Sequence, residues 1–151
     1  MICQSPVKSL DPAATGGITV AVPKRILVVE DNDLNRKLFC DVLKANGFEV
    51  VPVADGQNVI ATARKFMPHA VVLDIQLPNV SGIDLIAGFR ADRALRDIPI
   101  LAVTAYAGKG DEEKIRAAGA KDYLAKPVSI APFMAAVRGV LAEEDIETGT
   151  G

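Results

Sequence analysis

Five consecutive residues near the middle of the chain, Ala70-Val71-Val72-Leu73-Asp74, are apolar except for the last, which is an aspartate. Two other segments have a similar pattern: residues 25–29 lead into Glu30-Asp31, and residues 98–103 lead into Thr104. Continuous apolar runs of this length are typical of strands buried on both faces of a parallel sheet. The polar residues that end them should therefore meet at one edge of the sheet, where open α/β sheets bind ligands.

A fourth short segment ends in Lys126 and should bring an ammonium group to the same edge. Mg²⁺ typically binds through one or two carboxylates together with phosphate oxygens and water, so Asp31 and Asp74 are candidate metal ligands. The longer Glu30 side chain is expected to reach the ion through water. Lys126 and Thr104 can each bind one oxygen of a transferred phosphoryl group, whose charge the protein must neutralise. The sequence therefore predicts a site for magnesium and phosphoryl chemistry.

The composition is that of an ordinary globular domain, with 151 residues of which 50% are hydrophobic and 24% charged. The formal net charge of -2, without clustered Lys and Arg, argues against a nucleic-acid surface. The apolar runs are far shorter than the roughly 20 residues that a membrane span requires. Residues 1–23 lack the pattern of a signal peptide, so we expect a cytoplasmic protein that binds neither nucleic acid nor membrane. Cys3 and Cys40 are expected to be reduced thiols, because they are too few and too isolated for a disulfide framework or a zinc site.

Patterns typical of a strand and a helix alternate five times along the chain. Residues 1–23 are expected to be a flexible leader, residues 24–142 the folded domain, and residues 143–151 a flexible acidic tail. A second strand is predicted over residues 48–53. The helices are predicted from apolar residues at helical spacing: Leu34, Leu38, Val42 and Ala45 in the first; Val59, Ile60, Ala63 and Phe66 in the second; Ile83, Ile86 and Phe89 in the third, which Ser81 should cap; residues 111–118 in the fourth; and Phe133, Val137 and Leu141 in the fifth, which Ser129 should cap.

Five short motifs occur in a fixed order: Val28-Val29-Glu30-Asp31-Asn32, Leu73-Asp74-Ile75-Gln76-Leu77-Pro78, Ser81-Gly82, Thr104-Ala105 and Lys126-Pro127. Together they resemble the receiver domain of bacterial response regulators, from Lys24 to about Ala142. Within that CheY-like family the chain is most similar to stand-alone DivK-like regulators of the cell cycle, which share Glu30-Asp31 where most receivers carry two aspartates. The resemblance implies a flavodoxin-like (βα)5 three-layer sandwich, with a five-stranded parallel sheet of order 2-1-3-4-5.

The resemblance also implies how phosphoryl transfer and metal binding are divided among the acidic residues. Asp74 would be the phosphoacceptor, taking the group from a phosphohistidine on a partner. Asp31, Asp74 and the backbone carbonyl of Gln76 would hold Mg²⁺ or Mn²⁺, and Glu30 would contribute through water.

Thr104 and Lys126 would bind the phosphoryl oxygens, and Thr104 together with Tyr106 would form the switch, although Tyr106 could instead be a packing residue. The phosphodonor would be a histidine kinase or a histidine phosphotransferase. A downstream protein would bind the face made by the fourth helix, the fifth strand and the fifth helix. We expect a monomer or weak dimer that signals by protein contact and is not an enzyme, though it could phosphorylate itself from small phosphodonors and dephosphorylate itself.

Two other classes share parts of this pattern. A magnesium-dependent aspartyl-phosphate phosphohydrolase of the haloacid-dehalogenase type would need a second acid where this chain has Gln76, and a cap domain. An adaptor with the receiver fold but without phosphorylation would have no use for the full set of acids, Thr104 and Lys126. His69, the only histidine, could be a phosphodonor, but its position in a turn favours a solvated or capping imidazole.

Overall fold

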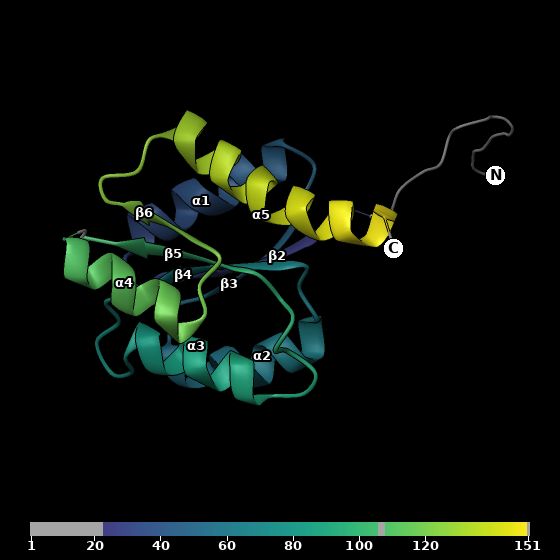
Figure 1. The fold of residues 1–151 in the computed structure, drawn as a ribbon. Coiled ribbons are helices and arrows are strands. Elements are labelled where there is room, and N and C mark those ends of the chain that lie inside the picture. The colour runs from purple at the N-terminus through teal and green to yellow at the C-terminus, as the bar shows by residue number, and fades with distance from the viewer. Residues whose placement is uncertain (1–22, 106–107, 151) are drawn as a thin grey trace, which may run out of the picture.

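The computed structural model describes residues 23–105 and 108–150. Five parallel strands form one sheet in the order β3-β2-β4-β5-β6 (Figure 1). Counted along the described chain, this is the order 2-1-3-4-5, so the predicted fold class is confirmed. The strands are β2 (Arg25–Val29), β3 (Glu49–Val53), β4 (Ala70–Asp74), β5 (Ile100–Thr104) and β6 (Asp122–Ala125).

The register of the strands brings their carboxyl ends to one edge. Val29 pairs with Leu73, Asp74 with Val103, and Thr104 with Ala125. The ladder continues one residue past two of the strands, because the Ile75 N–H donates to Val103 (2.9 Å) and the Lys126 N–H donates to Thr104 (2.8 Å). These bonds fix the backbone on which the predicted site residues stand.

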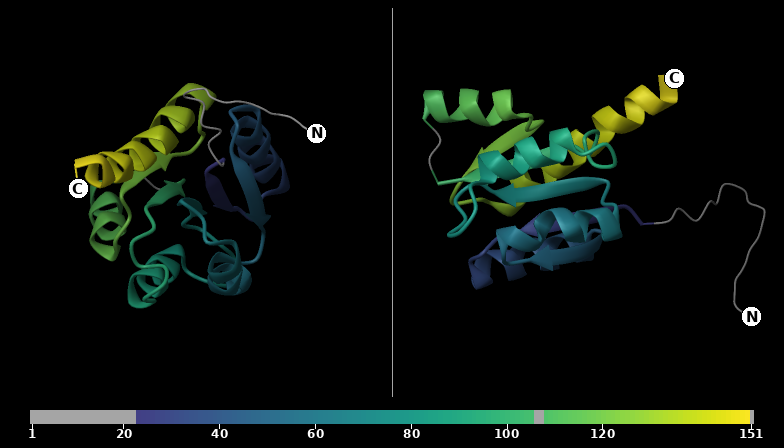
Figure 2. Two further views of the ribbon diagram at one scale, coloured as in Figure 1. Left: turned by 90° about the vertical axis from the view of Figure 1, so that its right-hand side faces the viewer. Right: turned by 90° about the horizontal axis from the view of Figure 1, so that it is seen from below.

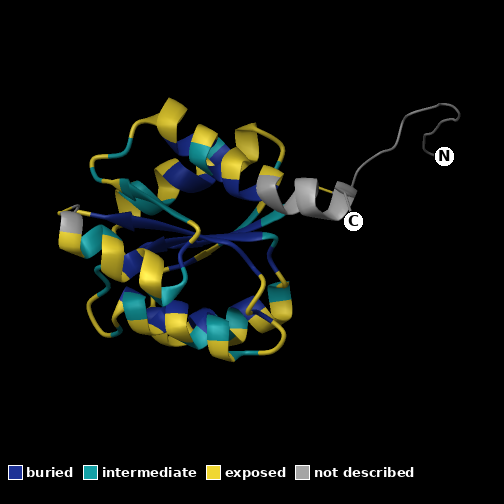
Figure 3. Cartoon of the chain, in the orientation of Figure 1, coloured by how far each residue is buried: buried dark blue, intermediate teal, exposed yellow. Residues whose placement is uncertain are grey.

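Helices cover both faces of the sheet, which gives the three predicted layers (Figures 1 and 2). On one face α1 (Asp33–Ala45) and α5 (Ile130–Thr150) pack on alternate strand residues such as Ile26 and Val28. On the other face η1 (Gly56–Asn58), α2 (Val59–Phe66), α3 (Gly82–Ala91) and α4 (Lys109–Ala118) lie over residues such as Leu27 and Val29. Figure 3 shows the result: the central strands are buried, the edge strands are partly exposed, and the outer surfaces of the helices are exposed. In the described part of the chain, no helix is long and apolar enough to cross a membrane.

Helix α1 buries a different set of residues from the one that the predicted spacing suggests. Its core residues are Phe39, Cys40 and Leu43, and the Phe39 ring stacks on Phe133 of α5 with 4.7 Å between centroids. Leu34 is 76% exposed. The predicted helix is confirmed, but its repeat follows a stripe next to the face that packs against the sheet, and of its four residues only Val42 packs against the core. The other predicted helix faces agree better with the structure, since Val59, Ala63, Ile86, Phe89, Phe133, Val137 and Leu141 are all buried.

The helix ends also differ in detail from the predictions. Ser81 is the N-cap residue of α3, but its side chain makes no capping hydrogen bond. Helix α4 begins at Lys109, two residues earlier than predicted, and α5 starts directly after Ser129. Helix α5 continues to Thr150, through most of the segment predicted to be a tail. The predicted leader, apart from Pro23, lies outside the described residues.

Candidate functional site

Three carboxylates lie together at the carboxyl edge of the sheet. Glu30 and Asp31 follow β2, and Asp74 is the last residue of β4. One oxygen from each lies within 4.8 Å of the other two. Glu30 and Asp74 are buried, whereas Asp31 is exposed. The structure thus brings together the three acids that the sequence predicts as one group.

Lys126 provides a positive charge for this group. Its Nζ lies 3.0 Å from Asp74 Oδ2 and 3.2 Å from Glu30 Oε1. Burial tends to lower the pKa of the Lys126 ammonium, but the hydrogen bonds and charges of Asp74 and Glu30 outweigh burial, so the pKa is raised. Lys126 therefore stays protonated, and one ammonium faces two buried carboxylates.

One cation does not balance the buried charge. Burial, and next its contact with Asp74, raises the pKa of Glu30 from 4.5 to about 7. Glu30 Oε2 accepts a hydrogen bond from the Asn32 N–H at 3.1 Å. Glu30 Oε1 is close to the Lys126 ammonium but outside hydrogen-bond geometry, and it accepts no hydrogen bond from the described residues. Glu30 thus sits in an environment that favours an additional cation.

The acid group fits a small hard cation such as Mg²⁺. Its ligand atoms would be carboxylate oxygens, the type that Mg²⁺ prefers, and the buried Glu30 Oε1 accepts no hydrogen bond within the described part of the chain. Gln76 lies in the loop that follows Asp74, and its N–H donates to Asp74 Oδ1 at 2.9 Å. This places the Gln76 backbone N–H beside the acids, and the role of the Gln76 carbonyl as a ligand stays a prediction.

Thr104 ends β5, the strand next to Asp74, and its side chain is buried. Its Oγ1 accepts a hydrogen bond from Gln76 Nε2 at 2.9 Å. The neighbouring Ala105 N–H donates to Gln76 Oε1 at 3.0 Å. The Gln76 side chain therefore bridges the ends of β4 and β5, a contact that the sequence does not predict.

Tyr106, the predicted aromatic partner of Thr104, lies outside the described residues. Another aromatic residue, Tyr123 on β6, was missed by the sequence reasoning. Its hydroxyl donates to Glu112 Oε1 of α4 at 3.0 Å, and the Arg116 guanidinium lies 5.5 Å from its ring centroid. Tyr123 thereby joins β6, the strand that Lys126 follows, to α4. No sequence signal marks this residue, because an aromatic side chain inside a short strand looks like an ordinary packing residue.

His69 lies at the opposite end of the sheet from the carboxylates. Its side-chain Nδ1 accepts a hydrogen bond from the Arg25 N–H at 2.8 Å, and the backbone N–H of His69 donates to the Arg25 carbonyl at 2.7 Å. The imidazole caps the start of β2, as the capping interpretation predicts.

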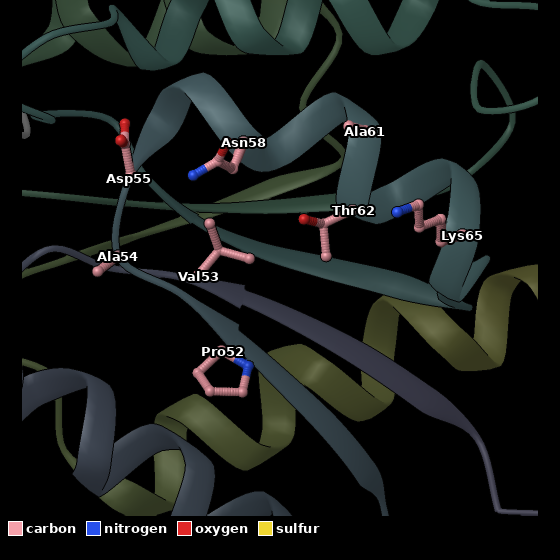
Figure 4. Close-up of a pocket in the computed structure, with 8 residues that line it drawn as sticks. All are labelled: Pro52, Val53, Ala54, Asp55, Asn58, Ala61, Thr62 and Lys65. Atoms are coloured by element: carbon pink, nitrogen blue, oxygen red, sulfur yellow. The ribbon is translucent and has the colours of Figure 1, made fainter.

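An open hollow of about 500 Å³ lies beside β3 and α2 (Figure 4). Its lining includes Pro52, Asn58 and Lys65, and none of the predicted site residues that the structure describes. The predicted site therefore lies at the carboxylate group and not at this hollow.

Comparison with known proteins identifies the family. Residues 26–138 match the response regulator receiver domain. The chain belongs to this family. It is 42% identical over 122 residues to the polar-differentiation response regulator DivK of Brucella anthropi, covering 81% of this chain and 99% of that one. DivK of Brucella ovis is 42% identical over 120 residues, covering 80% and 98%.

Solved receiver structures have the same fold. Chemotaxis protein CheY4 of Vibrio cholerae superposes with a TM-score of 0.76 at 25% identity, covering 80% of this chain and 100% of that one. The receiver domain of the Pseudomonas aeruginosa sensor histidine kinase PA1611, solved with a magnesium ion coordinated in its active-site cleft, has a TM-score of 0.74 at 34% identity, covering 80% and 99%. This chain is thus a DivK-like receiver domain of two-component signalling.

Proposed function

We propose that this receiver accepts a phosphoryl group onto Asp74 from the phosphohistidine of a histidine kinase or histidine phosphotransferase, in the cytoplasm. The observation that carries the proposal is the contact of one buried carboxylate with two groups: Asp74 Oδ2 with the Lys126 ammonium, and Asp74 Oδ1 with the Gln76 N–H. These contacts hold the carboxylate in one orientation at the sheet edge. An Asp74 oxygen bonds to phosphorus as the P–N bond to the donor imidazole breaks.

The reaction needs a further cation, because the incoming phosphoryl group is an anion approaching three carboxylates. Asp31, Asp74 and the Gln76 carbonyl would hold Mg²⁺ or Mn²⁺, with Glu30 in support; the bound ion would neutralise charge on the phosphoryl oxygens. The residues that bind these oxygens directly are Lys126 and Thr104. The magnesium in the PA1611 receiver supports this assignment.

Phosphorylation would act through protein contacts and not through turnover of a separate substrate. Thr104 is the switch residue in this proposal, with Tyr106 as the predicted aromatic partner. The Tyr123–Glu112 hydrogen bond supports a second connection, from β6 to α4. A downstream protein would then read the face made by α4, β6 and α5, and the receiver itself would be a monomer or weak dimer.

Incubation with acetyl phosphate and Mg²⁺ tests the proposal, with intact-protein mass spectrometry as the readout. We expect the added mass of one phosphate, which hydroxylamine removes, as expected for an acyl phosphate. Asp74→Asn should abolish the added mass, because the amide keeps the shape but loses the nucleophile. Asp84→Asn, an exposed position on α3, is the matched control and should behave as the unmodified sequence does.

Two results would contradict the proposal. Labelling that persists in Asp74→Asn would place the acceptor elsewhere. Continuous release of phosphate at many turnovers per chain, without accumulation of phosphoprotein, would indicate a phosphohydrolase.

A further inference from the structure

The side chain of Gln76 contacts two polar groups, one on the last residue of β5 and one on the residue that follows. Its Nε2 donates to Thr104 Oγ1 (2.9 Å), and its Oε1 accepts from the Ala105 N–H (3.0 Å). The two contacts use both ends of the amide, so they hold it in one orientation. Because β5 lies next to β4, the amide spans the gap between the phosphoacceptor strand and the Thr104 strand.

The backbone below this side chain is held in place. The Gln76 N–H donates to Asp74 Oδ1, and Gln76 forms an antiparallel bridge with Ser81. The Gly82 N–H donates to the Ile75 carbonyl at 3.0 Å, and a Cβ on Gly82 would lie only 2.5 Å from Ile75 Cα. The loop is therefore closed on itself, and release of the Thr104 and Ala105 contacts requires a rotation of the Gln76 side chain.

A phosphoryl group on Asp74 would compete for the same partners. Its oxygens are hydrogen-bond acceptors, and the donors that β5 offers at this edge are the Thr104 hydroxyl and the Ala105 N–H. The Ala105 N–H already donates to Gln76 Oε1, and movement of Thr104 toward the phosphoryl group would stretch its contact with Gln76 Nε2. We infer that the Gln76 amide is a latch that holds the unphosphorylated form and must open when Asp74 is phosphorylated. This inference rests on the proposed function of Asp74.

The structure contains a space that can receive the released amide. A hollow of about 90 Å³ lies between the β4–α3 loop, β5 and α4, and its lining includes Gln76, Thr104, Asp111 and Lys114. A water molecule takes about 30 Å³ in the liquid, so the space accommodates an amide group. Asp111 and Lys114 of α4 line this space together with Ile75, Ile83 and Ile115. Opening of the latch would thus move the Gln76 side chain from β5 toward α4, the helix of the proposed partner face.

Gln76→Met tests the latch, because methionine keeps the length of the side chain and removes both hydrogen bonds while the backbone carbonyl remains. Beryllofluoride, a phosphoryl mimic, is titrated at saturating Mg²⁺ and followed by ¹⁹F NMR of the bound species. Intramolecular hydrogen bonds change an equilibrium by up to about tenfold each. We expect Gln76→Met to lower the half-saturating beryllofluoride concentration about threefold to tenfold. The control is Gln57→Met, at an exposed position in η1, and should leave the concentration unchanged.

A second measurement on the free protein tests the geometry without any ligand. In Gln76→Met the Ala105 N–H loses its acceptor, so its amide proton should shift upfield and exchange faster with solvent. Gln76→Asn, shorter by one methylene, should show the same changes, because its amide cannot span the same distance; it also serves if Gln76→Met does not fold.

The outcomes separate the latch from the proposed function. If the unmodified protein binds beryllofluoride and Gln76→Met binds it equally or more weakly, the latch is refuted and the proposed function stands. If the unmodified protein does not bind beryllofluoride in an Asp74-dependent way, the proposed function fails and the latch fails with it. An unchanged Ala105 amide in both Gln76 variants also refutes the latch, whatever beryllofluoride does.

Discussion

Replacement of Glu30 by glutamine should stabilise the metal-free protein at pH 8 and have little effect at pH 4.5. Glu30 is buried, lies beside Asp74, and has a pKa raised to about 7 by burial and then by that neighbour. A glutamine amide resembles the protonated carboxyl group in shape and in its ability to donate a hydrogen to Asp74. The variant therefore imitates the protonated form of Glu30, which avoids the cost of burying a charge beside Asp74.

The sign follows from the protons bound in each state. Between pH 4.5 and about 7 the unfolded chain has released the Glu30 proton while the folded protein still binds it, so raising the pH lowers the free energy of unfolding. Above pH 7 Glu30 is ionised in both the folded and the unfolded state. The folded protein then carries the full free-energy cost of burying the Glu30 charge. The difference between about 7 and 4.5, at about 1.4 kcal/mol per pH unit, corresponds to about 3 kcal/mol. Glu30→Gln should recover most of this amount at pH 8.

Urea denaturation in EDTA, at several values between pH 4.5 and 8, measures the effect for the unmodified protein and for Glu30→Gln. Subtracting the two curves removes the contributions of titrating groups that do not interact with Glu30. Saturating Mg²⁺ at pH 8 should stabilise the unmodified protein more than the variant, since the ion offsets the charge that glutamine lacks. Parallel pH profiles for the two proteins in EDTA would refute the reasoning, because they would mean that Glu30 ionises without a penalty in the folded state.

Three further changes probe the other parts of the site. Asp31→Ala should weaken Mg²⁺ binding at least about tenfold, and more than Glu30→Gln does, because only Asp31 is an expected direct ligand. Equal losses of Mg²⁺ affinity in a calorimetric titration of the two variants would contradict these unequal roles. Gly82→Ala should cost about 1–3 kcal/mol in urea denaturation because its Cβ would meet the Ile75 backbone, whereas Gly139→Ala, with nothing within 4 Å, should be neutral or stabilising. Tyr123→Phe removes the hydrogen bond to Glu112, so it should reduce the NMR chemical-shift changes that beryllofluoride causes in the amides of α4. If Tyr106→Phe reduces these changes and Tyr123→Phe does not, the connection through Glu112 is unimportant.

The sheet could be predicted from the sequence because its three central strands are buried on both faces. Each is a short apolar run that ends in a polar residue, and neither feature depends on packing details. The buried face of α1 was harder to predict, since two overlapping stripes of apolar residues are present. The structure buries Phe39 and Leu43 and leaves Leu34 near the helix start in solvent. Spacing alone does not show which stripe faces the sheet.

The site residues were predictable to the extent that they occupy the ends of strands. Glu30, Asp74 and Thr104 reach one edge through strand register alone. The contacts of Gln76 depend on its side-chain rotamer and on the closed loop under it, and neither is visible in a sequence pattern. The missed Tyr123 lies inside an edge strand, where an aromatic residue looks like an ordinary packing residue until its hydrogen bond to Glu112 is seen.

The groups that would bind a phosphoryl group already have partners in the free protein. Lys126 faces Asp74 and Glu30, and both Thr104 and the Ala105 N–H contact the Gln76 amide. Phosphorylation would therefore exchange one set of contacts for another of similar kind. Because most of the gain from new contacts is offset by the loss of old ones, the two states can differ by only a few kcal/mol. With a free-energy difference of this size, a modification or a partner that modestly prefers one state can change the populations of the two states. A switch requires this property.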